Sequence, residues 1–149
     1  MKMTFGLIFL CIFIIGSSYA RTDQEVKQTF VQEAVECSKE IPVSKDDIQK
    51  LKETHVAANK NVKCLVKCVF QRKGMIDDKG MFDESGSMKM SEKEYESDKD
   101  KMESVKKLYD ICKKVNDEQI SDDEDGCERA AALANCLSDN AVQLGFSIF

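Results

Sequence analysis

The sequence predicts an all-α protein, a compact bundle of about six helices. The 149-residue chain contains one proline, so few positions interrupt a helix, and the helix-favouring residues Lys, Glu, Gln, Ala and Met recur along it. Apolar residues recur three or four positions apart in several segments, whereas no stretch of strand length alternates apolar and polar residues. Together these features favour helices over strands.

The first 20 residues have the composition of a secretory signal peptide. Lys2 precedes an apolar run from Phe5 to Ile15, and the small residues Ser18 and Ala20 suit a cleavage site. A membrane anchor is the alternative, but it would need about 20 apolar residues. We therefore expect residues 1–20 to be removed and residues 21–149 to form one secreted domain.

The mature chain is expected to be acidic. Without Lys2, 21 basic residues face 27 acidic residues, and the net charge is −6. Nucleic acids and anionic membranes are therefore poor candidate partners, and no stable membrane insertion is expected. Cys11 leaves with the signal, so six cysteines remain, and an even number in an exported chain predicts three disulfides.

Two helices are predicted at the start of the mature chain. Over residues 23–38 the apolar residues share one side of a helix, which Ile41-Pro42 ends. Ser44 is a candidate N-cap for a second helix that runs to about residue 54. Asp47 stands where it would complete a capping box with Ser44.

The middle of the chain predicts one strong helix and one weak helix. The strong helix covers about residues 57–71, and Gly74 ends it. Residues 77–101 are mostly charged residues, Ser and Gly, so we expect a loop with a weak helix near residues 89–97.

Two more helices are predicted near the C-terminus. The first has an apolar face formed by Met102, Val105, Leu108, Tyr109, Cys112 and Val115. Ser121 and Glu124 form a candidate capping box for the second. Its apolar residues include Ala130, Leu133, Ala134 and Leu137.

The cysteine spacing limits the possible disulfides. Cys64 and Cys68 lie about one turn apart on one helix, and their nearly parallel Cα–Cβ bonds do not bring the Cβ atoms within about 3.5 to 4.5 Å. Cys127 and Cys136 point to opposite sides of their helix, about 180° apart. Excluding both pairs leaves ten of the fifteen pairings of six cysteines. The helix with Cys64 and Cys68 is therefore expected to be bonded to two other segments.

Metal binding and catalysis are not expected. Structural zinc sites favour paired ligands at Cys-x2-4-Cys spacing, and Cys64 with Cys68 is the only such pair. A Ser-His or Cys-His pair would have to use His55, the only histidine, which we interpret as a surface residue with a pH-sensing gate residue as the alternative. No common hydrolase, metalloprotease or phosphate-loop motif is present. The segment DDKGMFDE, residues 77–84, lacks the order of a calcium loop and is interpreted as a solvated turn. No cofactor is predicted.

The cysteines follow the spacing Cys37-x26-Cys64-x3-Cys68-x43-Cys112-x14-Cys127-x8-Cys136. This spacing, with the flanking segments KCLVKCVF, DDKGMFD and CLSDNA, resembles that of the insect odorant-binding proteins, the pheromone-binding and general odorant-binding group. The x3 and x8 gaps are the most specific marks, and the resemblance covers essentially all of residues 21–149.

The resemblance implies three interlocked disulfides, Cys37–Cys68, Cys64–Cys127 and Cys112–Cys136, which is one of the ten remaining pairings. It also implies six helices around an internal apolar cavity. The implied function is a non-catalytic carrier of small hydrophobic ligands, such as odorants, pheromones or fatty compounds, in extracellular fluid. The implied partners are this ligand and an olfactory receptor surface, for a protein that is a monomer or a weak homodimer.

Apolar side chains on the helices, in the Lys-Gly loop and in the C-terminal tail are candidates for the cavity wall. In the family, the position of Phe82 commonly faces the ligand, and tails of this size fold against the cavity. A tail held by carboxylate contacts that acid would loosen is one hypothesis, and simple core packing is the other. The candidate ligand-lining residues are Val66, Phe70, Met81, Phe82, Met88, Met90, Tyr109, Leu133, Phe146, Ile148 and Phe149.

The alternative function is a secreted, disulfide-stapled helical protein that binds another protein through a surface patch. An enclosed apolar pocket of about 300 to 1,000 Å³ would favour the carrier over this alternative.

Overall fold

The computed structural model describes residues 20–120 and 125–147. Three predicted features lie outside these ranges: the signal peptide apart from Ala20, the candidate capping box of Ser121 and Glu124, and the tail residues Ile148 and Phe149. The described chain contains α1 (Asp23–Cys37), α2 (Lys45–Thr54), α3 (Lys60–Arg72), α4 (Glu84–Tyr95), α5 (Lys99–Cys112), η1 (Lys113–Asp117), α6 (Cys127–Ala141) and η2 (Val142–Leu144). The prediction of an all-α bundle of about six helices is confirmed.

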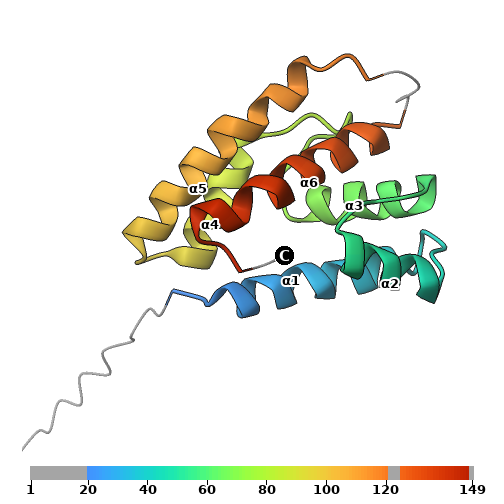
Figure 1. The fold of residues 1–149 in the computed structure, drawn as a ribbon, viewed down its shortest axis with the longest axis horizontal. Helices are drawn as coiled ribbons and strands as arrows, with labels where there is room; N and C mark the ends of the chain where they lie inside the picture. The colour runs from blue at the N-terminus through green and yellow to red at the C-terminus, as the bar shows by residue number, and fades with distance from the viewer. Residues whose placement is uncertain (1–19, 121–124, 148–149) are drawn as a thin grey trace, which may run out of the picture.

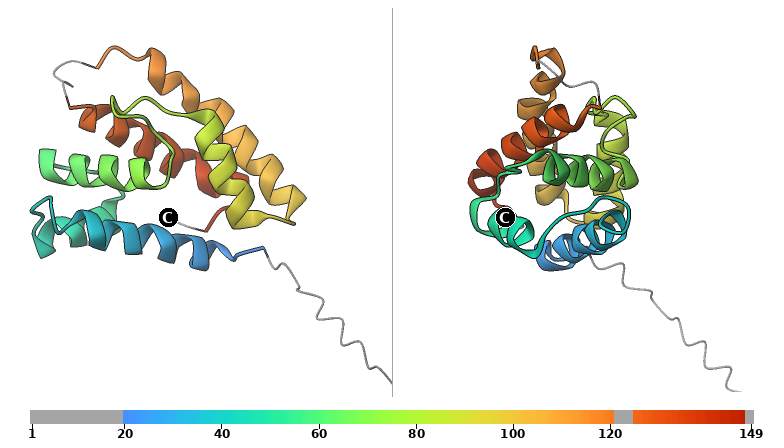
Figure 2. Two further views of the ribbon diagram at one scale, coloured as in Figure 1. Left: turned by 180° about the vertical axis from the view of Figure 1, so that it is seen from behind. Right: turned by 90° about the vertical axis from the view of Figure 1, so that its right-hand side faces the viewer.

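The helices form a bundle with α1 and α2 on one side and α5 on the opposite side (Figures 1 and 2). The helix α3 lies between them and packs against α1, α2 and α6. The helix α5 packs against α4 and α6, and the C-terminal segment turns back toward α1 after α6. Segments far apart in the sequence are thereby brought around one interior.

Side chains cap most of the helices at the residues where the sequence leaves the helical pattern. Ser44 and Asp47 form the predicted capping box of α2, and Thr22 forms a second one with Glu25 at the start of α1. Asn59 caps α3, which therefore begins three residues later than residue 57. His55 ends α2 with a left-handed backbone, φ 55°.

The helix α4 is longer than predicted and begins earlier. It starts after Asp83, whose carboxylate accepts a hydrogen bond from the Gly86 amide. The sequence of this helix lacks an apolar stripe because its inward face carries Ser87, Ser91 and Glu94, all at most 3 % exposed. The predicted loop and helix are therefore present, but the bounds of 89–97 are wrong because the buried polar residues hide the helical period.

Three disulfides connect four helices in series. Cys37–Cys68 joins the end of α1 to α3, Cys64–Cys127 joins α3 to the start of α6, and Cys112–Cys136 joins the end of α5 to α6. This is the pairing that the family resemblance implies. The two cysteines on one face of α3 bond to two different helices, as the helical geometry requires.

The loop between α3 and α4 is held by side-chain hydrogen bonds to its backbone and by close packing of that backbone. Ile76 and Phe82 form an isolated antiparallel bridge around a turn, and the Asp77 carboxylate accepts hydrogen bonds from two backbone amides of that turn. The Asn116 side chain accepts a hydrogen bond from the Phe82 amide at 2.8 Å and donates one to the Phe82 carbonyl oxygen at 2.9 Å. The acidic run thus forms a turn, docked on η1.

Gly80 and Gly126 bring this loop and the start of α6 together. Both have positive φ angles, 76° and 70°, and a Cβ atom on Gly80 would lie 2.3 Å from the Gly126 carbonyl oxygen. Glycine is therefore required at this contact for both conformation and space.

Candidate ligand-binding site

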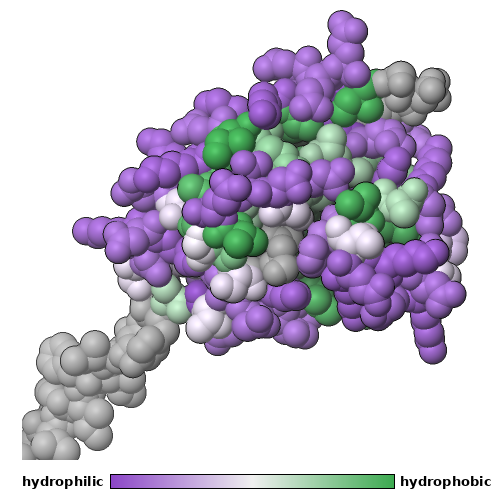
Figure 3. Space-filling view, viewed as in Figure 1, coloured by the Kyte–Doolittle hydropathy of each residue, from purple (hydrophilic) through white to green (hydrophobic). Residues whose placement is uncertain are grey.

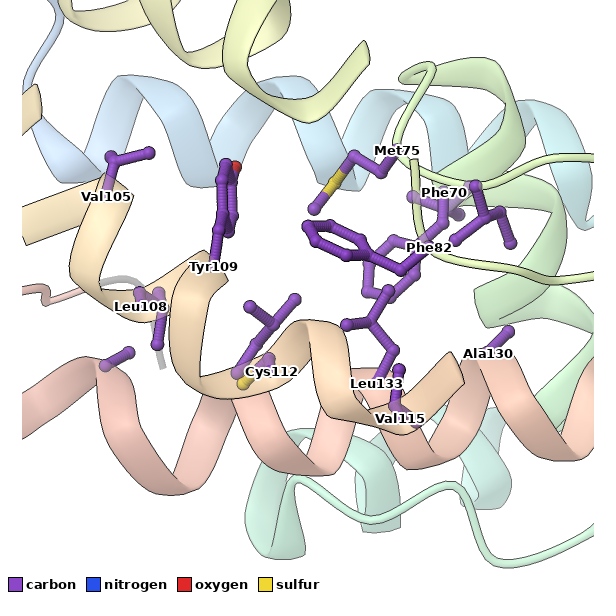
Figure 4. Close-up of a cluster of buried hydrophobic side chains, with 14 of the residues drawn as sticks. Phe70, Met75, Phe82, Val105, Leu108, Tyr109, Cys112, Val115, Ala130 and Leu133 are labelled. Atoms are coloured by element: carbon purple, nitrogen blue, oxygen red, sulfur yellow. The ribbon is translucent and has the colours of Figure 1, made fainter. Parts of the chain in front are cut away.

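An apolar cavity of about 110 Å³ lies between α1, α3, α4, α5, α6 and the C-terminal segment. Its wall is formed by Val26, Lys27, Phe30, Phe70, Met75, Met90, Ser91, Tyr95, Val105, Leu108, Tyr109, Leu137 and Phe146. Figure 4 shows part of the surrounding cluster, with Val105, Leu108 and Tyr109 projecting from α5. The wall is almost wholly apolar, so the site suits an apolar molecule.

The cavity is smaller than the about 300 to 1,000 Å³ that is usual for small-molecule sites. A dry cavity of about 150 Å³ in another protein holds benzene. In this conformation the site therefore fits a molecule of about that size, and a larger ligand requires the wall to move or the cavity to join a neighbouring space.

Such a space lies directly beside the cavity. A shallower apolar groove of about 240 Å³ runs between α1, α2, α3 and α6. Lys27, Phe30 and Phe70 line both spaces, and the Phe30 and Phe70 rings meet edge to face with centroids 6.5 Å apart. These two rings form the partition between the cavity and the groove.

The polar group inside the cavity wall is a pair of hydroxyls. Ser91 Oγ on α4 and the Tyr109 hydroxyl oxygen on α5 lie 2.7 Å apart in a buried hydrogen bond. Burial raises the pKa of Tyr109 to about 12, and the hydrogen bond with Ser91 works in the opposite direction. Tyr109 is therefore protonated at physiological pH.

The C-terminal segment closes one end of the cavity. Gly145 turns the chain with φ 82°, and Phe146 follows, 4 % exposed, with its ring 6.2 Å from the Tyr95 ring. The Lys101 ammonium donates a hydrogen bond to the Gly145 carbonyl oxygen at 2.8 Å and lies 4.6 Å from the centroid of the Phe146 ring. Phe146 is thus held in the wall from two directions.

Asp23 holds the same segment from α1. Its carboxylate accepts a hydrogen bond from the Ser147 amide at 2.6 Å and forms an ion pair with Lys101. The Tyr95 hydroxyl also donates to Asp23, at 3.4 Å. Burial, followed by the charge of Asp23, raises the pKa of Tyr95, so this hydroxyl is a donor at physiological pH. We call Asp23, Lys101, Gly145 and Ser147 the tail latch.

A buried ion network lies at the C-terminal end of α4. The Glu94 carboxylate, 4 % exposed in its side chain, pairs with Lys73 at 3.0 Å and with Arg21. Burial works to raise the pKa of Glu94, but the hydrogen bonds and charges of Lys73 and Arg21 outweigh it and lower that pKa. Lys73 also lies 4.9 Å from the centroid of the Phe30 ring. The network therefore joins α4 to the start of α1 and the end of α3 beside the cavity.

Four of the predicted ligand-lining residues lie in the cavity wall: Phe70, Met90, Tyr109 and Phe146. Val66 lies in the neighbouring groove instead. Ile148 and Phe149 lie outside the described residues.

The other predicted residues lie away from the cavity wall. Phe82 is fixed by Asn116 and packs against Tyr109 with ring centroids 5.4 Å apart, on the side facing Met75 (Figure 4). Met81 lies half-buried in the turn. Met88 is about 200° around α4 from Met90, and packs against the core elsewhere.

Leu133 is fully buried, and the residue of α6 that reaches the cavity is Leu137, one turn later. Sequence reasoning missed several wall residues: Val26, Lys27, Phe30, Met75, Ser91, Tyr95, Val105, Leu108 and Leu137. Val26, Phe30, Val105, Leu108 and Leu137 belong to predicted apolar helix faces, which was the available signal. Ser91 and Tyr95 carry no such signal because α4 lacks an apolar stripe.

Residues 20–120 and 125–147 contain no group of three or more His, Cys, Asp or Glu side chains that could hold a metal ion. Within the same residues, no helix is long and apolar enough to cross a bilayer.

Comparison with known proteins finds one matching family model and one similar solved structure. The family model is that of the PBP/GOBP family, and it matches residues 19–140. The structure is the odorant-binding protein dmelOBP28a from Drosophila melanogaster, with a TM-score of 0.62 and 23% sequence identity over 83% of this chain and 98% of that chain. No curated protein matches the sequence.

Proposed function

We propose that this chain, which belongs to the PBP/GOBP family, is a secreted carrier that binds small hydrophobic ligands and transports them in extracellular fluid without catalysis. The observation that carries the proposal is the almost wholly apolar cavity between the helices, with Phe146 buried in its wall. The disulfide-linked helices around it support a stable container. Odorants, pheromones and fatty compounds are the ligand classes that we expect.

The binding energy would come from removing apolar ligand surface from water. At about 25 cal/mol per Å², burying about 300 Å² contributes about −7.5 kcal/mol before ordering costs. Dissociation constants near the micromolar range correspond to about −8 kcal/mol. Such an affinity suits a carrier because the ligand is held in water and can still be released.

The surface gives less support to the alternative, a protein that acts through an apolar patch. Figure 3 shows a face covered mainly by hydrophilic residues, with small separate hydrophobic areas. In the described chain the exposed large hydrophobic residues come from several elements: Val31, Val35, Val56, Ile111 and Val142. Single exposed apolar residues are normal on soluble proteins and do not form a large patch.

The proposal also includes cleavage after residue 20, a mature domain of residues 21–149, and delivery of the ligand to an olfactory receptor surface. It further includes a monomer or a weak homodimer. The signal-like sequence and the family support these parts.

Binding of a fluorescent apolar probe, N-phenyl-1-naphthylamine, tests the carrier function. We expect saturable binding to the mature protein that small hydrophobic molecules displace. Val105→Phe fills the cavity and should weaken probe binding, whereas Val35→Phe on the exposed side of α1 should not. Absence of saturable binding, or equal binding by both variants and the unaltered protein, would contradict a ligand site in this cavity.

A further inference from the structure

The Ser91–Tyr109 pair has an unused hydrogen-bond donor. Each hydroxyl carries one hydrogen and two lone pairs, and one hydrogen is used in the bond between them. Within residues 20–120 and 125–147, neither hydroxyl makes another hydrogen bond, so the second hydrogen has no protein acceptor there. Ser91 is 1 % exposed and Tyr109 is 4 % exposed, so bulk water does not readily supply one.

The pair lies in the cavity wall, where its surroundings are apolar. Met90, Val105 and Leu108 are among its neighbours in the lining, and Tyr109 extends from α5 with its hydroxyl end directed away from α6 (Figure 4). The Tyr95 hydroxyl also belongs to the wall but donates to Asp23. A ligand in the cavity therefore meets this pair as the buried donor of the wall, since Lys27, which also lines the cavity, is an exposed residue.

We propose that Tyr109, positioned by Ser91, is a polar anchor that selects ligands carrying one hydrogen-bond-accepting oxygen, such as small ketones, aldehydes and esters. This inference rests on the proposed carrier function and names the ligand class for the same cavity. A buried donor without an acceptor is costly, and a ligand oxygen removes that cost, whereas a pure hydrocarbon does not.

The two hydroxyls are not equivalent in this role. The short side chain of Ser91 stays beside α4, whereas the ring of Tyr109 carries its hydroxyl away from its own helix and into the cavity wall. When Ser91 donates to the Tyr109 oxygen, the Tyr109 hydrogen is the one left for the ligand. Ser91 then orients the phenol, and Tyr109 is the donor.

The test compares two ligands of the same shape, acetophenone and α-methylstyrene, in which a carbonyl oxygen replaces a methylene group. A longer pair, 2-undecanone and 2-methyl-1-undecene, extends the test to larger ligands. Isothermal titration calorimetry gives the ratio of the two affinities for each protein. The different hydrophobicity of the two ligands cancels when this ratio is compared between variants.

We expect Tyr109→Phe to lower the ketone-to-hydrocarbon affinity ratio about fivefold to tenfold, the value of one hydrogen bond, through loss of ketone affinity alone. Ser91→Ala removes the hydroxyl that orients the phenol and should also lower the ratio, by less than Tyr109→Phe does. Unchanged hydrocarbon affinity shows that the cavity is intact. An unchanged ratio in Tyr109→Phe, or an equal loss for both ligands, overturns the anchor.

Infrared spectroscopy of a carbonyl-labelled ketone bound to the unaltered protein tests the anchor without any variant. The carbonyl stretch should lie at lower wavenumber than in hexane, and a band at the hexane position overturns the anchor while leaving the carrier function in place. If no ligand of either pair binds, the carrier function and the anchor are both overturned.

Discussion

Lys101 on α5 forms an ion pair with Asp23 on α1, with 3.1 Å between the ammonium and the carboxylate oxygen. Both side chains are less than one fifth exposed. Because each also bonds the backbone after α6, at Gly145 and Ser147, the pair connects two helices to the segment that carries Phe146.

Replacing Lys101 with methionine should release this segment. The change removes the charge and keeps the apolar stem, so Asp23 loses its partner and Gly145 loses a donor. We expect a loss of about 1.5 to 3 kcal/mol in local stability, faster amide exchange at residues 145–147, and faster ligand dissociation. Lys107→Met is the matched control because Lys107 pairs with Glu103 on the exposed side of α5. Equal exchange in the two variants would show that the tail latch does not hold the segment.

Acid should destabilise the protein through Glu94. A carboxyl whose pKa is lower in the folded state adds stability above its unfolded pKa, and this stability is lost as the pH falls through the folded pKa. The lowered pKa of Glu94 therefore predicts a loss that begins below about pH 4.3.

Glu94→Gln should lose about 1.5 to 3 kcal/mol at pH 7 and show a weaker pH dependence in this window. Thermal unfolding from pH 3 to pH 7 measures both effects. Glu103→Gln is the control, since Glu103 also has a lowered pKa, caused by Lys107, but is exposed. A parallel pH profile for Glu94→Gln and the unaltered protein would exclude this contribution.

Removing the Phe30 ring should lengthen the accepted ligand. Phe30→Ala opens the partition with Phe70, so the cavity and the neighbouring groove become one space. In a series of linear ketones the best-bound member should become longer. The cost in stability should stay below the about 3 to 5 kcal/mol of a fully buried Phe→Ala change, because Phe30 is half-buried.

Val31→Ala is the control for that series because Val31 lines the groove but not the cavity. An optimum at the same chain length in both variants would mean that the ring pair is not a partition.

Gly80→Ala should destabilise the protein more than Gly74→Ala. Both glycines have positive φ angles, 76° and 72°, so both changes carry a similar backbone strain. A Cβ atom at Gly74 meets nothing within 4 Å, whereas at Gly80 it meets the Gly126 backbone. The clash should add about 1 to 3 kcal/mol, measured by denaturant unfolding. Equal losses would show that the two segments separate at little cost.

The sequence predicted the elements whose signals are local. The Ser44–Asp47 capping box and the apolar face of α5 are written within a few residues of each other, and both appear in the structure. The cysteine spacing excluded pairings by helical geometry, while the choice among the rest needed the family.

Long-range contacts explain what the sequence could not predict. Ser87, Ser91 and Glu94 are buried on the inward face of α4 because residues from other segments bond to them. These partners are Met75, Tyr109, Lys73 and Arg21. Phe82 lies outside the cavity wall for a similar reason, since Asn116, 34 residues later, fixes its backbone. No pattern within one helix encodes such partners.

The disulfides divide the wall of the cavity into a fixed part and a yielding part. The helices α1, α3, α6 and α5 form one covalently linked series, whereas α4 contains no cysteine and is held by its buried polar contacts. A ligand larger than the cavity would therefore displace α4 or the segment that carries Phe146 before the four linked helices. On this view, the size of the largest ligand is set by the free energy needed to move α4 or this segment. The empty volume of the ligand-free state sets only the size of the ligand that binds without such a movement.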